Sequence, residues 1–388
     1  MAVRIATGLS TLPDPVEAGR EAAESAGEQL DGESAELAFV FASGAHLAAP
    51  EAMIDGIQEA LAPAALVGCG AGGVLGSGRE LESGTGIAVW AASFAGAGEI
   101  APFHTRLESE AGEARIAGLP ALEGAQAAVL LPDPYTFPTD AVLSALAMGA
   151  PGLPVLGGLA SARGPTGSAA LILDDNVCEE GAVGVCFRGV ELLPCVSQGA
   201  VPVGPEVTVT GAEGNVIHEL AGRPALETVE RLIAELPPRE RALVAGGLLI
   251  GIVVDGGKPE YQQGDFLVRG VIAADTESGR LTVGALVHPG QVIRLHARDA
   301  RSADEDLRRA LRLRMDALGG SRPAGALVFS CNGRGSAMFG SCNHDAEAVQ
   351  QELGGAPAAG FFAAGEIGPV GGRSFLHGFT ATVAVFPS

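Results

Sequence analysis

The sequence predicts a mixed α/β fold built from three related β-α-β-β units. Three observations support this prediction: a short apolar segment recurs three times, a glycine-bearing apolar segment follows each copy at a similar distance, and stretches with helical spacing lie between them. The chain has 388 residues, of which 47% are apolar and 18% charged. Ordinary soluble domains carry about 25% charged residues, so this composition indicates a large apolar core.

Each unit is expected to begin with two strands joined by a helix. The first strands cover residues 38–41, 128–131 and 326–329, and each runs into a polar or glycine-containing loop. The second strands carry Gly68, Gly157 and Gly360, which leaves room for one helix and two short loops in between. A third strand then closes each unit, at residues 86–91, 181–187 and 379–386.

The helices are expected where apolar residues recur every three or four positions. Met53, Ile57 and Leu61 show this spacing in the first unit, and residues 346–353 show it in the third. Further helices are expected at residues 16–30, 225–236 and 304–318. Residues 242–299 instead read as strands separated by turns, which fits either a degenerate fourth unit or an inserted antiparallel sheet.

A segment rich in proline and glycine, residues 194–205, separates the second unit from this strand-rich region. Such composition is typical of a domain boundary. We therefore expect two domains, residues 1–193 with two units and residues 194–388 with the strand-rich insert and the third unit.

The charge balance excludes some partners. The chain is acidic, with 46 acidic and 24 basic residues and a net charge of −22, whereas binding of nucleic acid needs a basic surface. The longest uncharged apolar run, residues 242–254, is shorter than the ~20 residues of a membrane helix. The N-terminus has no pattern of an export signal. We expect a cytoplasmic protein that binds neither nucleic acid nor membrane.

The cysteines and histidines predict no metal centre. The six cysteines form no C-x-x-C pair, so reduced thiols are expected. His218-Glu219 begins an H-E-x-x-H pattern but lacks the second histidine. No metal is predicted from these spacings.

Three strand-end residues are candidates for a site. If the units superpose, Ser43, Asp133 and Cys331 occupy equivalent positions just past their first strands, where rigid sheets hold functional loops. The alternative is that these residues only help the chain to leave a strand.

Two C-terminal motifs are more specific, residues 330–335 (SCNGRG) and 365–369 (GEIGP). Glu366 follows an apolar run and therefore needs a partner, for which Arg334 is the candidate. That pair would either lock two loops together or contact a ligand. Cys331, beside Asn332 and Arg334, is either an ordinary buried thiol or a nucleophile, although no base for it is visible.

The segment 68–73 (GCGAGG) fits the G-x-G-x-x-G pattern of dinucleotide-binding folds. The context does not fit, because the chain continues toward another strand instead of a helix, and the expected acidic residue is replaced by Trp90 and Ala91. We interpret these glycines as positions of close backbone approach, so that Cys69 and Gly70 could border a ligand.

With these motifs, the chain resembles the FIST family over nearly its whole length. Residues 67–74, the Asp133-Pro loop and residues 157–161 suggest the N-terminal module of that family. Residues 196–199, 222–226, 330–335 and 365–369 suggest the C-terminal module. A cysteine often follows Gln-Gly in the family, and Ala200 stands there in this chain.

The resemblance implies a sensory module for small ligands, with amino acids or their derivatives as proposed ligands and a separate signalling protein as output. Some family members resemble haem-containing nitric-oxide sensors, but no histidine here has a motif that would carry over the axial ligand. We predict no cofactor, with haem as an open alternative.

The leading hypothesis is a cytoplasmic protein that binds an amino-acid-like molecule and signals through a partner. The predicted ligand-binding residues are Cys331, Asn332, Arg334, Glu366, Cys69, Gly70 and Asp133. Arg334 would bind a carboxylate and Glu366 an amine. A haem-binding nitric-oxide sensor and an enzyme with Cys331 as its nucleophile are the alternatives.

Overall fold

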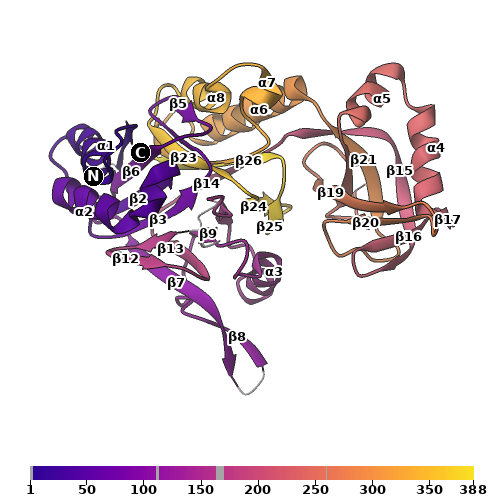
Figure 1. Cartoon of the computed structure of the whole chain (residues 1–388), viewed down its shortest axis with the longest axis horizontal. Helices are drawn as coiled ribbons and strands as arrows, with labels where there is room; N and C mark the ends of the chain where they lie inside the picture. The colour runs from indigo at the N-terminus through magenta and orange to yellow at the C-terminus, as the bar shows by residue number, and fades with distance from the viewer. Residues whose placement is uncertain (1–2, 111–112, 163–169, 259) are drawn as a thin grey trace. The chain divides into compact units, whose positions relative to one another are not determined.

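A computed structural model describes residues 3–110, 113–162, 170–258 and 260–388 (Figure 1). The mixed α/β class is confirmed. The chain forms two compact units. Unit 1 comprises residues 1–196, 307–376 and 381–388, and unit 2 comprises residues 197–306 and 377–380. The compact units therefore do not follow the expected division into 1–193 and 194–388, because the third β-α-β-β segment packs with the first two.

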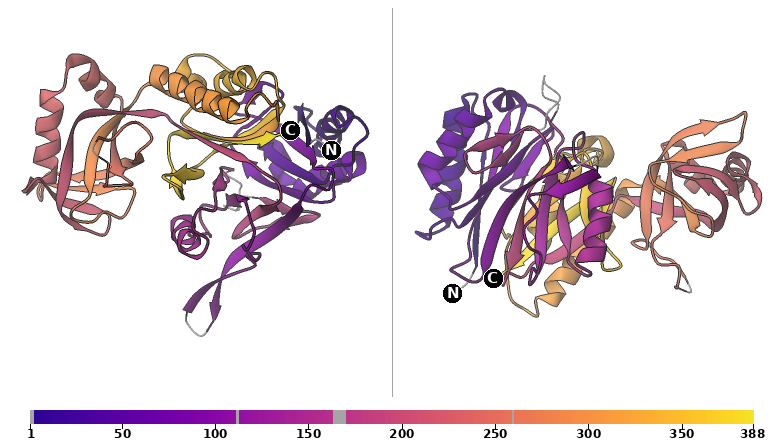
Figure 2. Two further views of the ribbon diagram at one scale, coloured as in Figure 1. Left: turned by 180° about the vertical axis from the view of Figure 1, so that it is seen from behind. Right: turned by 90° about the horizontal axis from the view of Figure 1, so that it is seen from below.

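Unit 1 contains three mixed sheets. The first has the order β1-β6-β2-β3-β11-β12. Its strands are β1 (Arg4–Ser10), β2 (Leu37–Ser43), β3 (Leu66–Ala71), β6 (Gly86–Ser93), β11 (Leu171–Leu173) and β12 (Asn176–Cys178). The helices α1 (Pro15–Gln29) and α2 (Pro50–Leu61) pack on its outer face, as the right-hand view of Figure 2 shows, and the short helix η1 (Gly44–Ala48) follows β2.

The second sheet has the order β25-β24-β10-β9-β13-β7-β8. Its strands are β7 (Glu99–Glu110), β8 (Glu113–Ala117), β9 (Ala127–Pro132), β10 (Val155–Gly158), β13 (Ala182–Arg188), β24 (Glu366–Val370) and β25 (Arg373–His377). One helix, α3 (Thr139–Gly149), covers its outer face through Val142 and Leu143.

The third sheet has the order β14-β26-β22-β23-β4-β5. Its strands are β4 (Val74–Gly76), β5 (Arg79–Leu81), β14 (Leu193–Gln198), β22 (Pro323–Cys331), β23 (Ala358–Ala363) and β26 (Thr380–Pro387). Helix α6 (Ala300–Ala317) precedes β22, and the helices α7 (Ser336–Phe339) and α8 (His344–Glu352) lie between β22 and β23. Leu307 and Leu311 of α6 and Val349 of α8 pack on the outer face of this sheet.

Unit 2 is built on an antiparallel sheet of the order β15-β21-β18-β19-β20-β16-β17, and a further β15–β16 pairing connects its two ends. Its strands are β15 (Ala200–Glu213), β16 (Val216–Leu220), β17 (Arg223–Pro224), β18 (Leu248–Val253), β19 (Phe266–Asp275), β20 (Arg280–Val283) and β21 (Val292–Arg298). Two helices complete it, α4 (Ala225–Glu235) and α5 (Pro238–Ala245). The strand-rich region is thus an inserted antiparallel sheet. Its predicted boundary segment, residues 194–205, lies mostly in β14 and β15.

The same strand pairing recurs three times in unit 1. β2, β9 and β22 each pair in parallel with the strand after their helix, β3, β10 and β23, and antiparallel with a third strand, β6, β13 and β26. Gly68, Gly157 and Gly360 occupy the same register position in the three pairs. A Cβ atom there would lie only 2.1, 1.9 and 1.7 Å from the carbonyl oxygen of the paired residue on the first strand. The recurring glycine permits this close approach.

The three sheets are joined by an exchange of hairpins. The hairpin β4–β5, which follows β3, pairs with β23 of the third sheet. The hairpin β24–β25, which follows β23, pairs with β10 of the second sheet, and β11–β12 pairs with β3 of the first sheet. Each hairpin therefore extends a sheet other than the one its preceding strand belongs to. The first sheet contributes to the third, the third to the second, and the second to the first.

The inner faces of the three sheets share one apolar core. Phe39 and Trp90 from the first sheet, Val129 from the second, and Phe329 and Phe361 from the third are all buried in it. Since β-strand side chains alternate between faces, the other residues of these strands pack under the helices outside. Among the described residues, no helix is long and apolar enough to cross a membrane.

Candidate functional site

The strand register places three of the predicted residues at equivalent positions. Ser43 pairs with Ala71 and Cys331 with Ala363, three residues after Gly68 and Gly360 on the parallel partner. Asp133 occupies the corresponding place after β9, because Gly157 pairs with Leu130. Ser43 donates its hydroxyl hydrogen bond to the Gly84 carbonyl at 3.0 Å and is buried, which is consistent with the structural alternative for this residue.

Asp133, Cys331 and Glu366 continue the inner faces of their strands. Asp133 follows the core residues Val129 and Leu131, and its N–H still pairs with the Gly181 carbonyl at 2.9 Å. Cys331 follows Phe329 in the same alternation. Glu366 pairs with Gly158, whereas its neighbour Ile367 packs in the outer core. The three side chains therefore lie at the end of the central core where the parallel strands β9, β10 and β22 have their carboxyl ends.

The chain segments that enter the exchanged hairpins lie against one another at this end. Gly73 accepts a hydrogen bond from the Phe362 N–H at 3.0 Å, and Gly365 accepts one from the Leu159 N–H at 2.8 Å. The Ser161 hydroxyl accepts from the Gly72 N–H at 2.9 Å and donates to the Phe362 carbonyl. Loops from all three sheets are thus held by direct contacts around the candidate site.

Asn332 lies at the exposed rim of this region. Its N–H donates to the Ala363 carbonyl at 2.9 Å, which fixes its backbone against the end of β23. Its side-chain Oδ1 would lie 3.9 Å from a Cβ atom on Gly72. The loops that follow β3 of the first sheet and β22 of the third sheet therefore lie side by side at Asn332.

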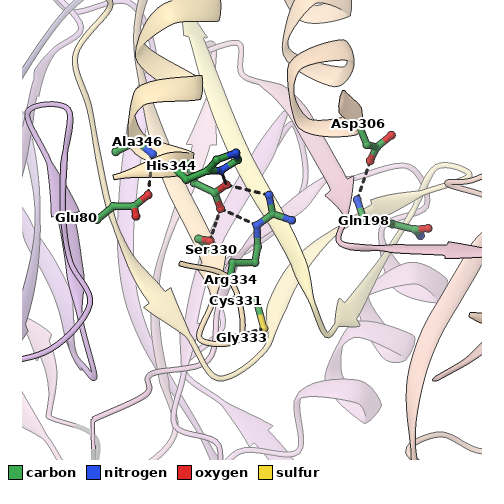
Figure 3. Close-up of polar contacts among 10 residues, drawn as sticks. Glu80, Gln198, Asp306, Ser330, Cys331, Gly333, Arg334, His344 and Ala346 are labelled. Carbon is green, nitrogen blue, oxygen red and sulfur yellow. Dashed lines mark hydrogen bonds and ion pairs between the residues drawn. The ribbon is translucent and has the colours of Figure 1, made fainter. Parts of the chain in front are cut away.

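Arg334 forms an ion pair with Asp345, a partner that the sequence did not predict, and its predicted partner Glu366 is an electrostatic neighbour. Arg334 binds Asp345 in a bidentate pair, with Nε 2.6 Å from Oδ2 and Nη2 2.9 Å from Oδ1. Asp345 also accepts from the Ser330 hydroxyl at 2.7 Å and lies 3.0 Å from Nδ1 of His344 (Figure 3). Planar guanidinium and carboxylate groups match in this geometry, so Arg334 is committed mainly to α8.

The electrostatics of this pair reflect its complete burial. Burial by itself favours the neutral carboxyl of Asp345, but Arg334, His344 and Ser330 hold its pKa well below the usual range. Burial alone would lower the pKa of Arg334, yet the anionic forms of Asp345, Cys331 and Glu366 keep it raised. Glu366 is therefore an electrostatic neighbour of Arg334, although Asp345 supplies the bidentate contact.

The buried polar atoms of the site that have no hydrogen-bond partner among the described residues include Oδ2 of Asp133 and Nη1 of Arg334. The other carboxylate oxygen of Asp133 accepts from the Tyr135 N–H at 2.8 Å. Buried polar atoms are normally paired, and an unpaired one costs about 1–3 kcal/mol. These two atoms are therefore available to a bound molecule.

Cys69 and Gly70 lie inside β3 and are buried beneath the loops that border the site. Burial raises the pKa of the Cys69 thiol, which keeps it protonated. A Cβ atom on Gly70 would approach Ala162 and Leu47 to 2.9 Å, and the Gly70 carbonyl accepts from the Ala162 N–H. Close packing of neighbouring loops explains these glycines better than direct ligand contact.

The sequence reasoning missed Asp345, Glu80 and Ser161 as residues that organise the site. Asp345 stands directly before the expected helical stretch 346–353, where an acidic residue is usually a solvated partner of the helix dipole. Glu80 lies in a short strand whose distant partner is not visible from local spacing. Only the Gly-Gly-Leu-Ala-Ser161 segment carried a signal, through the family resemblance.

A metal ion needs a cluster of ligating side chains, and haem needs an axial ligand at its pocket. Among the described residues, no group of three histidine, cysteine or acidic side chains is placed to hold a metal ion. Two cavities of about 270 and 590 Å³ lie in unit 1, and neither is lined by a histidine. An axial ligand for haem is thus not offered at these cavities.

Comparison with known proteins gives a consistent result along the chain. The model of the FIST N domain matches residues 36–223, and the model of the FIST C domain matches residues 225–369. An uncharacterized protein of Mycobacterium tuberculosis is 42% identical over 385 residues, which cover 99% of this chain and 100% of the relative. An uncharacterized protein of Mycobacterium bovis is 41% identical over 385 residues, 99% of each chain.

Proposed function

Because this chain belongs to the FIST family, whose domains are associated with small-ligand sensing in signal transduction, we propose that it binds a small amino-acid-like molecule at the strand-end site of unit 1. The site is defined by Asp133, Asn332, Arg334 and Glu366. A separate partner protein would carry the signal onward. Binding, not catalysis, is the proposed activity.

The buried carboxylate of Asp133 is the observation that carries this proposal. Asp133 is fully buried, and its Oδ2 has no hydrogen-bond partner within the described part of the chain. A ligand ammonium group would supply both a donor and an opposite charge to this oxygen. Glu366 extends from the same end of the core, two strands away across β10. Two carboxylates on one side of the site favour a cationic group on the ligand.

The carboxylate of an amino-acid ligand would find hydrogen-bond donors at Arg334 and Asn332, although neither offers a bidentate contact. The bidentate pair with Asp345 uses Nε and Nη2 of Arg334 and leaves Nη1 as a single donor. The exposed side-chain amide of Asn332 can donate beside it. The ligand carboxylate would therefore receive single hydrogen bonds from Arg334 and Asn332.

Thermal unfolding with and without amino acids tests the proposal. Wild type, Asp133→Asn and the control Asp55→Asn would be screened with the standard amino acids and simple amines; Asp55 is exposed on α2. At least one compound should raise the Tm of wild type and the control but not of Asp133→Asn, which keeps an acceptor for Tyr135 but loses the negative charge. Equal stabilisation of all three proteins, or of none, would contradict the proposal.

We also propose a cytoplasmic location, because all six cysteines are free thiols. The proposal uses no cofactor. A Soret band in protein purified from haem-supplied cells would instead favour the haem-containing sensor.

A further inference from the structure

The hairpin β4–β5 is held on α8 by one acidic side chain. Oε1 of Glu80 accepts a hydrogen bond from the Ala346 N–H at 2.8 Å, in the first turn of α8. The Glu80 N–H donates to Oδ1 of Asn343 at 2.8 Å, so the contact is reciprocal. Figure 3 shows the bond between the Glu80 side chain and Ala346. Glu80 thus caps a helix that belongs to the third sheet, although it lies in the hairpin that follows β3.

The surroundings of Glu80 disfavour its negative charge. Glu80 is 8% exposed, and its Oε2 is buried without a hydrogen-bond partner among the described residues. The charged groups that face it are Asp345 on α8 and Glu82 on its own hairpin segment, both acidic. Arg334 and His344 lie beyond them and are engaged by Asp345. Burial, then the charge of Asp345, raises the pKa of Glu80 to about 7, against the donated bond from Ala346.

The same hairpin is continuous with the wall of the ligand site. Directly before β4, the Gly72 N–H donates to the Ser161 hydroxyl, and the Gly73 carbonyl accepts from the Phe362 N–H. Glu82, at the other end of the hairpin, accepts from the N–H and the hydroxyl of Ser336, each at 2.8 Å, and so holds the loop that carries Asn332 and Arg334. Movement of this hairpin would therefore displace both loops that border the site.

We propose that Glu80 is a proton-operated latch, which holds the hairpin β4–β5 on α8 when its carboxyl group is neutral and loosens it when the group ionises. The latch itself stands on the contacts of Glu80. Its effect on ligand affinity rests on the function proposed above. Loss of the proton leaves a buried carboxylate close to Asp345, and this cost is relieved only when the hairpin moves into water.

Hydrogen exchange of the ligand-free protein tests the latch without reference to any ligand. Amide exchange in residues 74–82 would be measured between pH 6 and pH 8 and corrected for intrinsic rates. A carboxyl group whose pKa falls from about 7 to its ordinary 4.5 on release should increase opening of the hairpin by about tenfold over this range. In Glu80→Gln the pH dependence should vanish and the hairpin should stay protected at pH 8. The control Glu51→Gln, at an exposed glutamate of α2, should keep it.

A second measurement covers the case in which Glu80→Gln fails to fold. In wild type labelled with ¹³C at glutamate side chains, one carboxyl signal should titrate near neutral pH. The chemical shift of this signal should change when Asn343 is substituted, which assigns it to Glu80. Exchange that does not change with pH in wild type, or the same pH dependence in Glu80→Gln, would overturn the latch, as would titration of every glutamate near its ordinary pKa. None of these results would affect the amino-acid binding test.

Discussion

Arg334 and Asp345 form a closed, fully buried ion pair, in which two guanidinium nitrogens meet the two oxygens of one carboxylate at 2.6 and 2.9 Å. This pair fastens the loop after β22 to the start of α8. Arg334 therefore holds this loop in place in addition to presenting its Nη1 at the candidate site.

We predict that Asp345→Asn lowers the free energy of unfolding by about 3–5 kcal/mol, because it leaves the Arg334 charge buried without its partner. Urea unfolding followed by circular dichroism would measure the loss. Arg334→Met combined with Asp345→Asn should cost less than the sum of the two single changes, since both charges are then removed. Strict additivity of the two substitutions would show that the pair is not coupled.

Much of the fold was predictable because it depends on local patterns. Apolar strands followed by helices of regular spacing identified the segments around Gly68, Gly157 and Gly360, and the structure pairs each of them as expected. The hairpin exchange was not predictable, because short strands such as β4 and β11 have three residues each and find partners far away in the chain. Their pairing is set by the tertiary packing around them, which no spacing encodes.

The sequence predicted which strand ends come together, but not the side-chain contacts between them. Strand-end position and symmetry pointed to Asp133 and Cys331, and both lie at the end of the central core. The sequence predicted Glu366 as the partner of Arg334 and did not point to Asp345, which supplies the bidentate contact. Only the geometry of α8 places Asp345 against the guanidinium group.

Global stability should also depend on pH through Glu80. The pKa of an acid that is raised on folding, here from 4.5 to about 7, makes the folded protein bind more protons than the unfolded chain between these values. Its contribution is therefore favourable at low pH and is lost as pH rises toward 7, by on the order of 3 kcal/mol at most. Urea unfolding from pH 5 to pH 8 should show this decline in wild type and a smaller one in Glu80→Gln. Identical curves would contradict the assignment.

Alkylation separates the binding proposal from the enzyme alternative. Cys342 is exposed, whereas Cys331 is 8% exposed and Cys69 fully buried. With iodoacetamide at neutral pH, mass spectrometry should find Cys342 modified first, Cys331 more slowly and Cys69 last. If Cys331 instead reacts faster than Cys342 despite its burial, its thiol is activated, and catalysis through Cys331 becomes the better reading.

The three equivalent glycines allow a final prediction about the repeated architecture. At Gly68, Gly157 and Gly360 a Cβ atom would lie within 2.1 Å of a backbone oxygen of the paired strand, whose position the whole sheet fixes. Substitution by alanine at any of them should therefore force the parallel strands apart and lower the free energy of unfolding by more than about 3 kcal/mol.

Gly149→Ala is the matched control, because Gly149 ends α3 and nothing lies within 4 Å of a Cβ atom there. Its substitution should change stability by less than about 1 kcal/mol. The three core variants should resemble one another, since one strand pairing imposes the same contact on each. A tolerated alanine at one of the three would show that its pair can separate, and that the close strand approach is not required equally in all three sheets.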